Sequence, residues 1–262
     1  MPFTLAHAAA GIPLRRVPLV WSAFFIGCFA PDFEYFLWLS PQNSLGHHFP
    51  GVLTFTLPVA LVTLWAFHQF VREPLTRLLP VRVQQRLMAS VESFRWGGAK
   101  RISAILGSVA LGIASHVFWD AFTHGNTWAT DLWPVLVSPV NLSPFGMRPL
   151  VILLQLASSV LGMAALVLWA RGWYQRTEPA PELPQRHLSR NDKLVLACAM
   201  LVLAGAGAVV RAIQVIGMPD TQHDVHYFVV VLAVTSIALM WWQLLVLGVF
   251  WKTADRVKAS TL

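Results

Sequence analysis

Long apolar runs, separated by short polar connections, make up most of the sequence. Five of them, at residues 49–70, 102–122, 150–170, 194–213 and 227–250, have roughly the 20 residues that an α-helix needs to cross a bilayer. An earlier run over residues 17–30 is too short for a full span and follows Arg15 and Arg16. The pattern predicts an all-α polytopic membrane helical bundle, with an N-terminal helical hairpin over residues 1–39 and about five further spanning helices. We expect residues 1–262 to form a single integral-membrane domain.

Lys and Arg are distributed unevenly over the connections between these runs. They concentrate in residues 71–101 and 171–193, whereas residues 125–147 contain neither. Because cytoplasmic loops are enriched in Lys and Arg, we expect the first two segments to be basic cytoplasmic loops and residues 125–147 to face the other side. Trp128 and Trp133 within that segment are interpreted as part of an interfacial aromatic belt. The protein is predicted to cross the inner (cytoplasmic) membrane several times.

Composition supports a membrane protein and argues against other classes. Hydrophobic residues make up 56% and charged residues 12% of the chain, and the mean hydropathy is +0.59, well above the usual range of a soluble domain. The net charge of +7 resides mainly in the connections, so membrane topology explains it and we expect no nucleic-acid partner. Cys28 and Cys198 lie in separate apolar runs, which predicts buried small side chains and neither a disulfide nor a thiolate metal site.

A polar stripe interrupts the apolar run that begins near Ile102. His116, Asp120 and His124 lie four residues apart, so on a helix they share one face and rise about 12 Å in all. A carboxylate flanked by two imidazoles is costly in an apolar segment unless something compensates it, and a bound cation is the simplest compensation. We therefore predict a metal-binding or catalytic cluster; the alternative is a polar cluster that only fixes helix packing.

The spacing of this stripe leaves the number of metal ions open. Residues eight apart on a helix are too distant to reach the same ion without a break in the helix. Either the helix unwinds near Gly125 and brings His124 back, or Asp120 bridges two metal ions. The second alternative is preferred.

Further polar residues are predicted to reach the same side of the membrane. The hairpin returns Asp32 and Glu34 towards the first helix, which holds His7, and His47 and His48 precede the second membrane element. Taken alone, His7 is better explained as an ordinary histidine near the N-terminus, and Asp32 as a helix cap after Pro31. Together with the stripe, they can converge on one site. Glu34 is a candidate for a general base that activates water, or for a hydrogen-bond partner of a ligand.

Two other features bear on this site. Ser108 and Gly112 continue the line of the stripe towards the start of its helix and are small enough for another helix to approach closely, as a ligand-donating helix would need. Arg211 lies near the outer end of its span and is a candidate for binding an anionic substrate group. Its alternative role is snorkelling to the membrane interface.

Four motifs carry a resemblance to a known family. They are Met1-Pro2-Phe3-Thr4-Leu5-Ala6-His7, Ala30-Pro31-Asp32-Phe33-Glu34-Tyr35-Phe36, Gly46-His47 followed by Pro50-Gly51, and His116-Val117-Phe118-Trp119-Asp120-Ala121-Phe122-Thr123-His124. On these motifs nearly the whole chain resembles a family of bacterial multi-pass membrane proteins, the domain of unknown function 4184 family. That family is distantly similar to the membrane-bound metal-dependent hydrolases of bacterial inner membranes. The similarity implies that the metal-ligand positions are His7, Asp32, His47, His116, Asp120 and His124.

The sequence predicts a membrane-embedded metal-dependent hydrolase that acts on an ester or phosphoester of a lipid-like or envelope substrate at the outer face of the membrane. Imidazole and carboxylate donors suit a divalent ion, with zinc preferred and manganese or iron as alternatives. Asp120 and Glu34 are the predicted catalytic residues, and Arg211 the predicted substrate-binding residue. Expected partners are membrane lipid and a small-molecule or lipid-like substrate; the oligomeric state is left open. Alternatives are a transport or metal- or proton-binding protein without turnover, and a structural scaffold.

Overall fold

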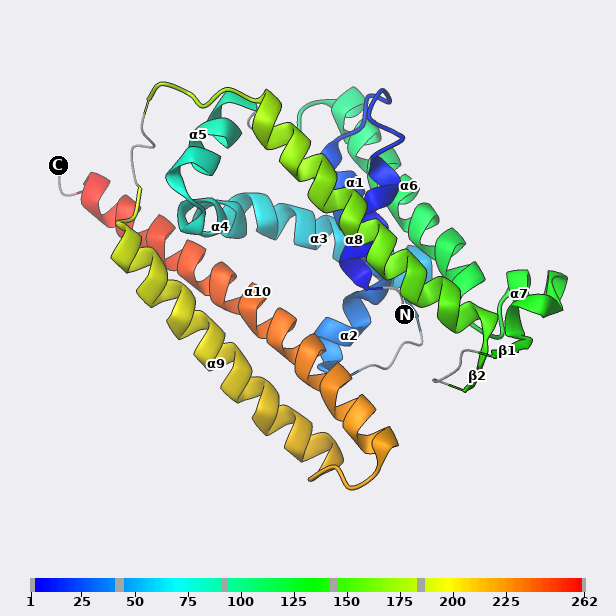
Figure 1. Cartoon of the computed structure of the whole chain (residues 1–262). Helices are drawn as coiled ribbons and strands as arrows, with labels where there is room; N and C mark the ends of the chain where they lie inside the picture. The colour runs from blue at the N-terminus through cyan, green and yellow to red at the C-terminus, as the bar shows by residue number, and fades with distance from the viewer. Residues whose placement is uncertain (1–2, 41–44, 91–93, 142–145, 183–186, 261–262) are drawn as a thin grey trace. The chain divides into compact units, whose positions relative to one another are not determined.

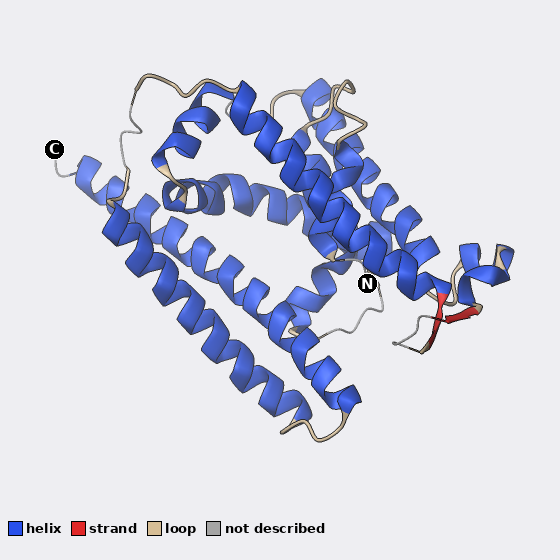
Figure 2. Ribbon diagram, in the orientation of Figure 1, coloured by secondary structure: helices blue, strands red, loops and turns tan. Residues whose placement is uncertain are grey.

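The fold is almost entirely helical, as predicted. A computed structural model describes residues 3–40, 45–90, 94–141, 146–182 and 187–260. Within this part of the chain, helices are joined by short connections, and one small antiparallel sheet pairs β1 (Pro139–Asn141) with β2 (Met147–Pro149) (Figures 1 and 2). Parts of the predicted loops, residues 41–44, 91–93, 142–145 and 183–186, lie outside the described residues.

The helices fall into two compact units. The first comprises Met1–Asp32, Leu45–Leu61 and Arg95–Arg176, and the second Phe33–Ser44, Val62–Phe94 and Thr177–Leu262. Two of the boundaries between them fall inside continuous helical stretches, between Asp32 and Phe33 and between Leu61 and Val62. The prediction of one integral-membrane domain stays a prediction.

Helices long and apolar enough to cross a membrane confirm the predicted spans. In the described residues there are five: Val52–Leu78, Ala99–Thr123, Leu150–Arg176, Arg190–Ile216 and Gln222–Asp255. The helix over Leu150–Arg176 illustrates why these helices need a lipid environment. Its side chains Leu156, Val160, Leu161 and Leu168 are all more than half exposed. Large aliphatic side chains exposed along a whole helix are stable against lipid and costly against water. The chain is a multi-pass membrane protein.

The first of these spans runs further than its apolar pattern predicted. It is one continuous helix made of η3 (Val52–Thr56), α3 (Leu57–Ala66), η4 (Phe67–Val71) and α4 (Arg72–Leu78), in which η3 and η4 are π-helical. It therefore extends beyond the predicted end at Phe70, into the basic connection. Arg and Glu are good helix formers, and Arg77 pairs with Glu73 one turn earlier. The connection also contains α5 (Val81–Ser90).

The predicted N-terminal hairpin is present as short helices in the first unit. η1 (Thr4–Gly11) is a 3₁₀ helix, and a turn through Arg15 and Arg16 leads to α1 (Trp21–Phe29). η2 (Ala30–Asp32) follows α1 directly, and α2 (Phe33–Trp38) belongs to the second unit. The hydroxyl of Thr4 donates a 2.6 Å hydrogen bond to Oδ2 of Asp32. This contact confirms that the hairpin returns to the helix that holds His7.

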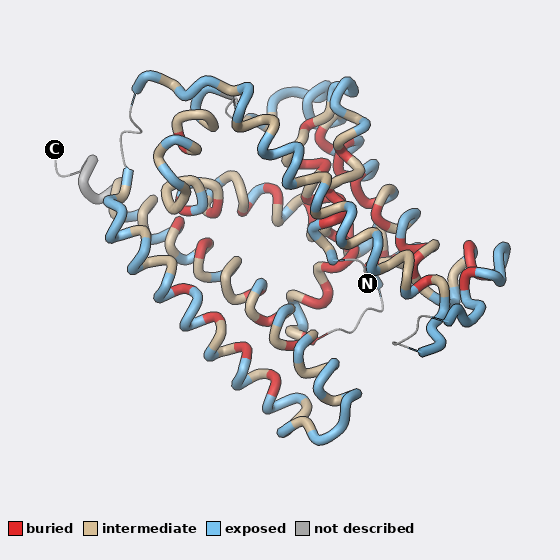
Figure 3. The backbone as a smooth tube through the Cα atoms, viewed as in Figure 1, coloured by how far each residue is buried: buried red, intermediate tan, exposed pale blue. Residues whose placement is uncertain are grey.

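Small residues let α1 pack very closely against α6 (Ala99–Thr123). A Cβ atom added to Gly112 would lie 2.3 Å from the carbonyl oxygen of Phe24, and one added to Gly27 would lie 2.3 Å from that of Val109. The amide of Val20 donates a 3.0 Å hydrogen bond to Oγ of Ser108. The buried residues of α6 accordingly recur on one face of the helix (Figure 3). The predicted close approach at Ser108 and Gly112 is confirmed.

A third helix of the first unit, α8 (Leu150–Arg176), supports η1 from another side. The amide of Phe3 donates a 2.9 Å hydrogen bond to Oγ of Ser159. A Cβ atom on Gly162 would lie 2.9 Å from the Cβ of Ala6, so the two backbones also approach closely here. η1 therefore contacts both α1 and α8.

In the second unit, α9 (Arg190–Ile216) and α10 (Gln222–Ser260) form an antiparallel pair (Figure 1). The buried positions of α9 lie four residues apart, at Met200, Ala204, Ala208 and Ala212, which is the small-residue spacing of closely packed membrane helices. Cys198 is exposed on α9, so the expectation that it is buried is wrong: it lies off this narrow buried stripe. Cys28 is buried, and both thiols are free.

Alanine at Gly112 is expected to destabilise the first unit. The added methyl group would force α1 and α6 apart, and overpacking of this kind costs about 1–3 kcal/mol. Thermal unfolding in detergent measures the change, with Gly107→Ala as the matched control on the same helix. Among the described residues nothing lies within 4 Å of a Cβ at Gly107, so the control should unfold at or above the wild-type temperature. Equal unfolding temperatures for the two variants would contradict the close approach.

Candidate metal centre

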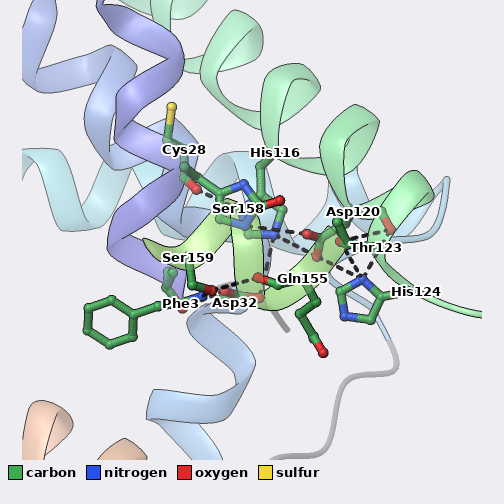
Figure 4. Close-up of polar contacts among 12 residues, drawn as sticks. Phe3, Cys28, Asp32, His116, Asp120, Thr123, His124, Gln155, Ser158 and Ser159 are labelled. Carbon is green, nitrogen blue, oxygen red and sulfur yellow. Dashed lines mark hydrogen bonds and ion pairs between the residues drawn. The ribbon is translucent and has the colours of Figure 1, made fainter. Parts of the chain in front are cut away.

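The six predicted ligand residues come together in the first unit. His7 is in η1, Asp32 ends η2, His47 lies in the connection before η3, and His116 and Asp120 are one turn apart in α6. His124 is the first residue after α6. Figure 4 shows four of the six, Asp32, His116, Asp120 and His124, with the contacts that join them. Segments that are far apart in the sequence thus supply one polar cluster.

Four of the six residues form the compact centre of this cluster. One carboxylate oxygen each of Asp32 and Asp120 and one ring nitrogen each of His47 and His116 all lie within 4.8 Å of one another. Nε2 of His47 is 3.1 Å from Nε2 of His116 and 3.2 Å from Oδ2 of Asp120. Nε2 of His116 is 3.3 Å from Oδ2 of Asp120 and 3.6 Å from Oδ1 of Asp32. Ligands about 2.0–2.1 Å from a tetrahedral zinc ion lie roughly 3.3 Å from one another, so these distances fit one ion.

The small number of protons available to the acceptor atoms of the centre also favours a bound cation. Nδ1 of His116 is 2.7 Å from the carbonyl oxygen of Cys28, and because a carbonyl oxygen only accepts, this nitrogen must carry the hydrogen. In a neutral imidazole Nε2 then presents a lone pair to the cluster. With both imidazoles neutral and both carboxyl groups ionised, at most one proton, on Nε2 of His47, remains among four closely spaced acceptor atoms. A bound cation would satisfy all four at once.

Two groups outside the centre orient its ligands. The carbonyl oxygen of Cys28 fixes the tautomer and ring orientation of His116, and the hydroxyl of Thr4 holds Oδ2 of Asp32 so that Oδ1 faces the histidines. Such outer hydrogen bonds are typical of metal-ligating His and carboxylate groups. Burial raises the pKa of the Cys28 thiol to about 12. Its Sγ lies 3.5 Å from Oγ of Ser115, and it is not among the four residues of the centre.

In the described part of the chain, three buried polar atoms without a hydrogen-bond partner lie at the same place: Nε2 of His7, Oδ1 of Asp32 and Oδ1 of Asp120. Asp32 lies outside the five spans, and burial raises the pKa of its carboxyl above the ordinary value, against the lowering effects of His116 and Thr4. Buried acceptors without a hydrogen-bond donor are rare in folded proteins, and a bound ion is one of the groups that can satisfy them.

His7 lies beside the centre and contacts it through Asp120. Its ring stacks on that of His116 at 3.8 Å between centroids, and its Nε2 is 3.4 Å from Oδ1 of Asp120. Burial, followed by the proximity of His116, lowers the pKa of His7 to about 3, so its imidazole is neutral at pH 7. A neutral imidazole is the form that binds metal ions. Asp120 therefore directs Oδ2 to the centre and Oδ1 to His7.

His124 reaches the cluster because the helix ends immediately before it. α6 stops at Thr123, and His124 has an extended backbone (φ −125°, ψ 153°). Its Nδ1 is 3.0 Å from the carbonyl oxygen of Asp120, to which it must donate, and 3.7 Å from Oδ2 of Asp120. A helix break near this point was one of the two alternatives from the sequence. Whether the site takes one or two ions, and whether His124 is a ligand, remain predictions.

The other predicted functional residues belong to the second unit or to the surface. Glu34 is 1% exposed in α2, and its role as a base stays a prediction. Arg211 donates to the carbonyl oxygens of Trp38 at 3.2 Å and Leu39 at 3.5 Å, an interaction that stabilises the C-terminal end of α2; substrate binding by Arg211 likewise stays a prediction. His48 is exposed and stands apart from the metal group.

Sequence reasoning missed Thr4 and the carbonyl of Cys28. Thr4 stands three residues before His7 in the N-terminal motif, and that spacing is the only sequence signal for its contact with Asp32. A backbone carbonyl leaves no signal at all, because every residue has one. Its role follows only from the close packing of α1 on α6.

The fold and the cluster define a class: a multi-pass helical membrane protein with a buried His and Asp site able to hold a metal ion. Within this class the chain belongs to the family described as Domain of unknown function (DUF4184), which matches residues 1–249. No curated protein and no solved structure matches the chain.

Removal of a central ligand is expected to abolish metal binding. His116→Ala and Asp120→Ala each delete one of two donor atoms that lie 3.3 Å apart, and we expect both purified variants to lose near-stoichiometric metal. Elemental analysis of detergent-purified protein measures it. His48→Ala is the matched control, since it removes the exposed histidine next to His47. Wild-type metal content in His116→Ala and Asp120→Ala would exclude the site.

Replacing the hydroxyl of Thr4 should weaken the site without removing a ligand. Thr4→Val keeps the shape of the side chain but leaves Oδ2 of Asp32 without its donor. Changes to such outer partners lower metal affinity about 10- to 100-fold. Competition with a chromogenic chelator measures the affinity, and Ser159→Ala, which removes the hydrogen bond from Phe3 instead, controls for a general loosening of η1. Equal affinities in the two variants would argue against the orienting role of Thr4.

Proposed function

We propose that the protein is a membrane-embedded hydrolase that uses a divalent metal ion to cleave an ester or phosphoester of a lipid-like or envelope substrate. The observation that carries this proposal is the four-residue centre of Asp32, His47, His116 and Asp120, whose donor atoms lie within 4.8 Å of one another. Two carboxylates and neutral imidazoles balance the charge of a divalent ion. Zinc is the preferred ion, and manganese and iron are alternatives.

The donor set suits hydrolysis of a polar bond. A divalent ion held there would supply Lewis acidity, which polarises an ester or phosphoester oxygen and acidifies water. Asp120 would bind the ion and orient His124 through its backbone carbonyl, while His7 packs against the ring of His116. Glu34 is the proposed base that takes a proton from water, and Arg211 the proposed contact for an anionic substrate group.

Access to the cluster favours a substrate that approaches from one edge. The side chains of Asp32 and His116 are fully buried, whereas those of His47 and His124 are 18% and 32% exposed. An ion carrier would need its ligands to open on both sides of the membrane. A centre that is closed around Asp32 and His116 and open beside His47 and His124 supports turnover of an external substrate better than passage of the ion.

The substrate class follows from the position of this edge. His124 stands where α6 ends, and α6 is long and apolar enough to span the bilayer. A reactive edge at the end of a span meets the headgroup region, where the ester and phosphoester bonds of lipids lie. The distribution of Lys and Arg supports a non-cytoplasmic position for this end, and the proposed location is the outer face of the inner (cytoplasmic) membrane.

The test is hydrolysis by metal-loaded protein in detergent. Bis(p-nitrophenyl) phosphate and a fluorogenic phospholipid are the reporters, and we expect activity that Asp120→Ala abolishes and His48→Ala preserves. Glu34→Gln should keep its metal but lower kcat by about 100-fold or more, the usual contribution of a general base. Stoichiometric metal without turnover on any reporter would favour a metal- or proton-binding protein. Absence of metal from the folded wild-type protein would favour a polar cluster that only stabilises helix packing.

A further inference from the structure

The connection between α6 and α8 exposes apolar side chains although it is not a membrane span. It contains α7 (Trp128–Leu132), η5 (Pro134–Val137) and the two short strands, and it is largely exposed in Figure 3. Its large exposed apolar residues include Trp128 (50%), Leu132 (62%), Trp133 (45%), Val135 (60%), Val137 (43%) and Met147 (58%). Large apolar side chains exposed close together along the chain indicate a site of interaction with another molecule or with lipid.

This connection is a fixed structure with a core of its own. Ala129 and Leu136 are buried together with Ala121 of α6 and Val151 of α8. Thr127 caps α7, and its hydroxyl also donates a 2.6 Å hydrogen bond to the carbonyl oxygen of Ala121. The apolar side chains named above therefore point outward because the inward positions of the connection are already filled.

Four aromatic rings form the part of this surface nearest to α6. We call Phe118, Phe122, Trp128 and Trp133 the outer aromatic group. Phe122 contacts the other three, with ring centroids 5.2 Å from Phe118, 5.4 Å from Trp128 and 5.8 Å from Trp133. Phe118 lies two residues from both His116 and Asp120, so it is on the opposite face of α6 from the metal cluster.

We propose that residues 127–137 bind phospholipids of the leaflet at which α6 ends, with the outer aromatic group at the boundary between headgroups and acyl chains. The connection joins the ends of two spans, α6 at Thr123 and α8 at Leu150, so it is tethered to the membrane surface at both ends. Trp residues are enriched at this boundary because their rings are apolar and their N–H groups hydrogen-bond.

Charge in the connection favours lipid over a soluble partner. Residues 125–147 contain no Lys or Arg, and Asp131 is their one ionisable acid. A surface built to bind a soluble protein carries a polar rim around its apolar centre. Here the apolar side chains of α7 and η5 continue directly from the aromatic face of α6, which is part of a span. The lipid that surrounds α6 therefore extends over the connection.

Depth-dependent quenching tests this inference independently of the metal site. Leu132→Cys and Val135→Cys are made in a Cys198→Ala background and labelled with a fluorophore; Cys28 is buried and its raised pKa keeps it unreactive. Asp131→Cys is the matched control, because it lies on the same short helix and is polar and exposed. The labelled proteins are placed in phosphatidylcholine and phosphatidylglycerol vesicles that contain nitroxide lipids. All three positions are exposed, so none of the changes touches the core.

We expect labels at 132 and 135 to be quenched by shallow nitroxide lipids about twofold or more above the label at 131, and to be shielded from iodide in the water. Equal access of iodide to all three labels would overturn the proposal. So would a disulfide between two copies of the Leu132→Cys variant in vesicles, since a second copy would then occupy the surface. Gel filtration of each labelled variant verifies that the protein is folded before the measurement.

Discussion

The buried carboxylates of Asp32 and Asp120 are the constraint on which the first unit depends. Their residues are 0% and 4% exposed, and an isolated buried charge costs several kcal/mol. Among the described residues, the ion-pair partners of these carboxylates are all imidazoles, and His7, with a pKa of about 3, brings no charge at pH 7. Imidazoles can share a metal ion with carboxylates, whereas a Lys would repel it. These neighbours therefore suit a cluster that could hold a divalent cation.

Backbone packing determines where these side chains meet. Gly27 and Gly112 allow α1 and α6 to approach until a Cβ atom on either would lie 2.3 Å from a carbonyl oxygen of the other helix. The same approach places the carbonyl oxygen of Cys28 2.7 Å from Nδ1 of His116. Loss of the close contact would turn the His116 ring and remove its lone pair from the centre. The same close contact therefore determines both the stability of the α1–α6 pair and the geometry of the site.

The sequence predicted the spans, the hairpin and the polar stripe of α6, because apolar length and a four-residue spacing are local patterns, whereas the full set of ligand positions came from the family resemblance. It did not show which residues stand nearest to one another. By spacing, His124 belongs beside Asp120 and His47 is only a loop residue, yet His47 lies 3.1 Å from His116. That proximity depends on how the loop folds over α6, which no local pattern encodes. The hydrogen bonds of Arg211 could not be predicted from a local pattern either. They join it to the carbonyl oxygens of Leu39 and Trp38, which are 172 and 173 residues away in the sequence.

One break in the helix affects both the metal cluster and the connection that follows α6. If α6 continued for another turn, His124 would rise about 6 Å above Asp120 and close the edge between them. Instead the helix ends at Thr123, and Asn126 adopts a positive φ of 57° that reverses the chain. Thr127 then returns its hydroxyl to the carbonyl oxygen of Ala121 and starts α7. The same turn that leaves the side chain of His124 partly exposed therefore directs Trp128 onto Phe118 and Phe122. One turn thus determines both the end of the polar stripe of α6 and the aromatic contacts of the connection that follows it.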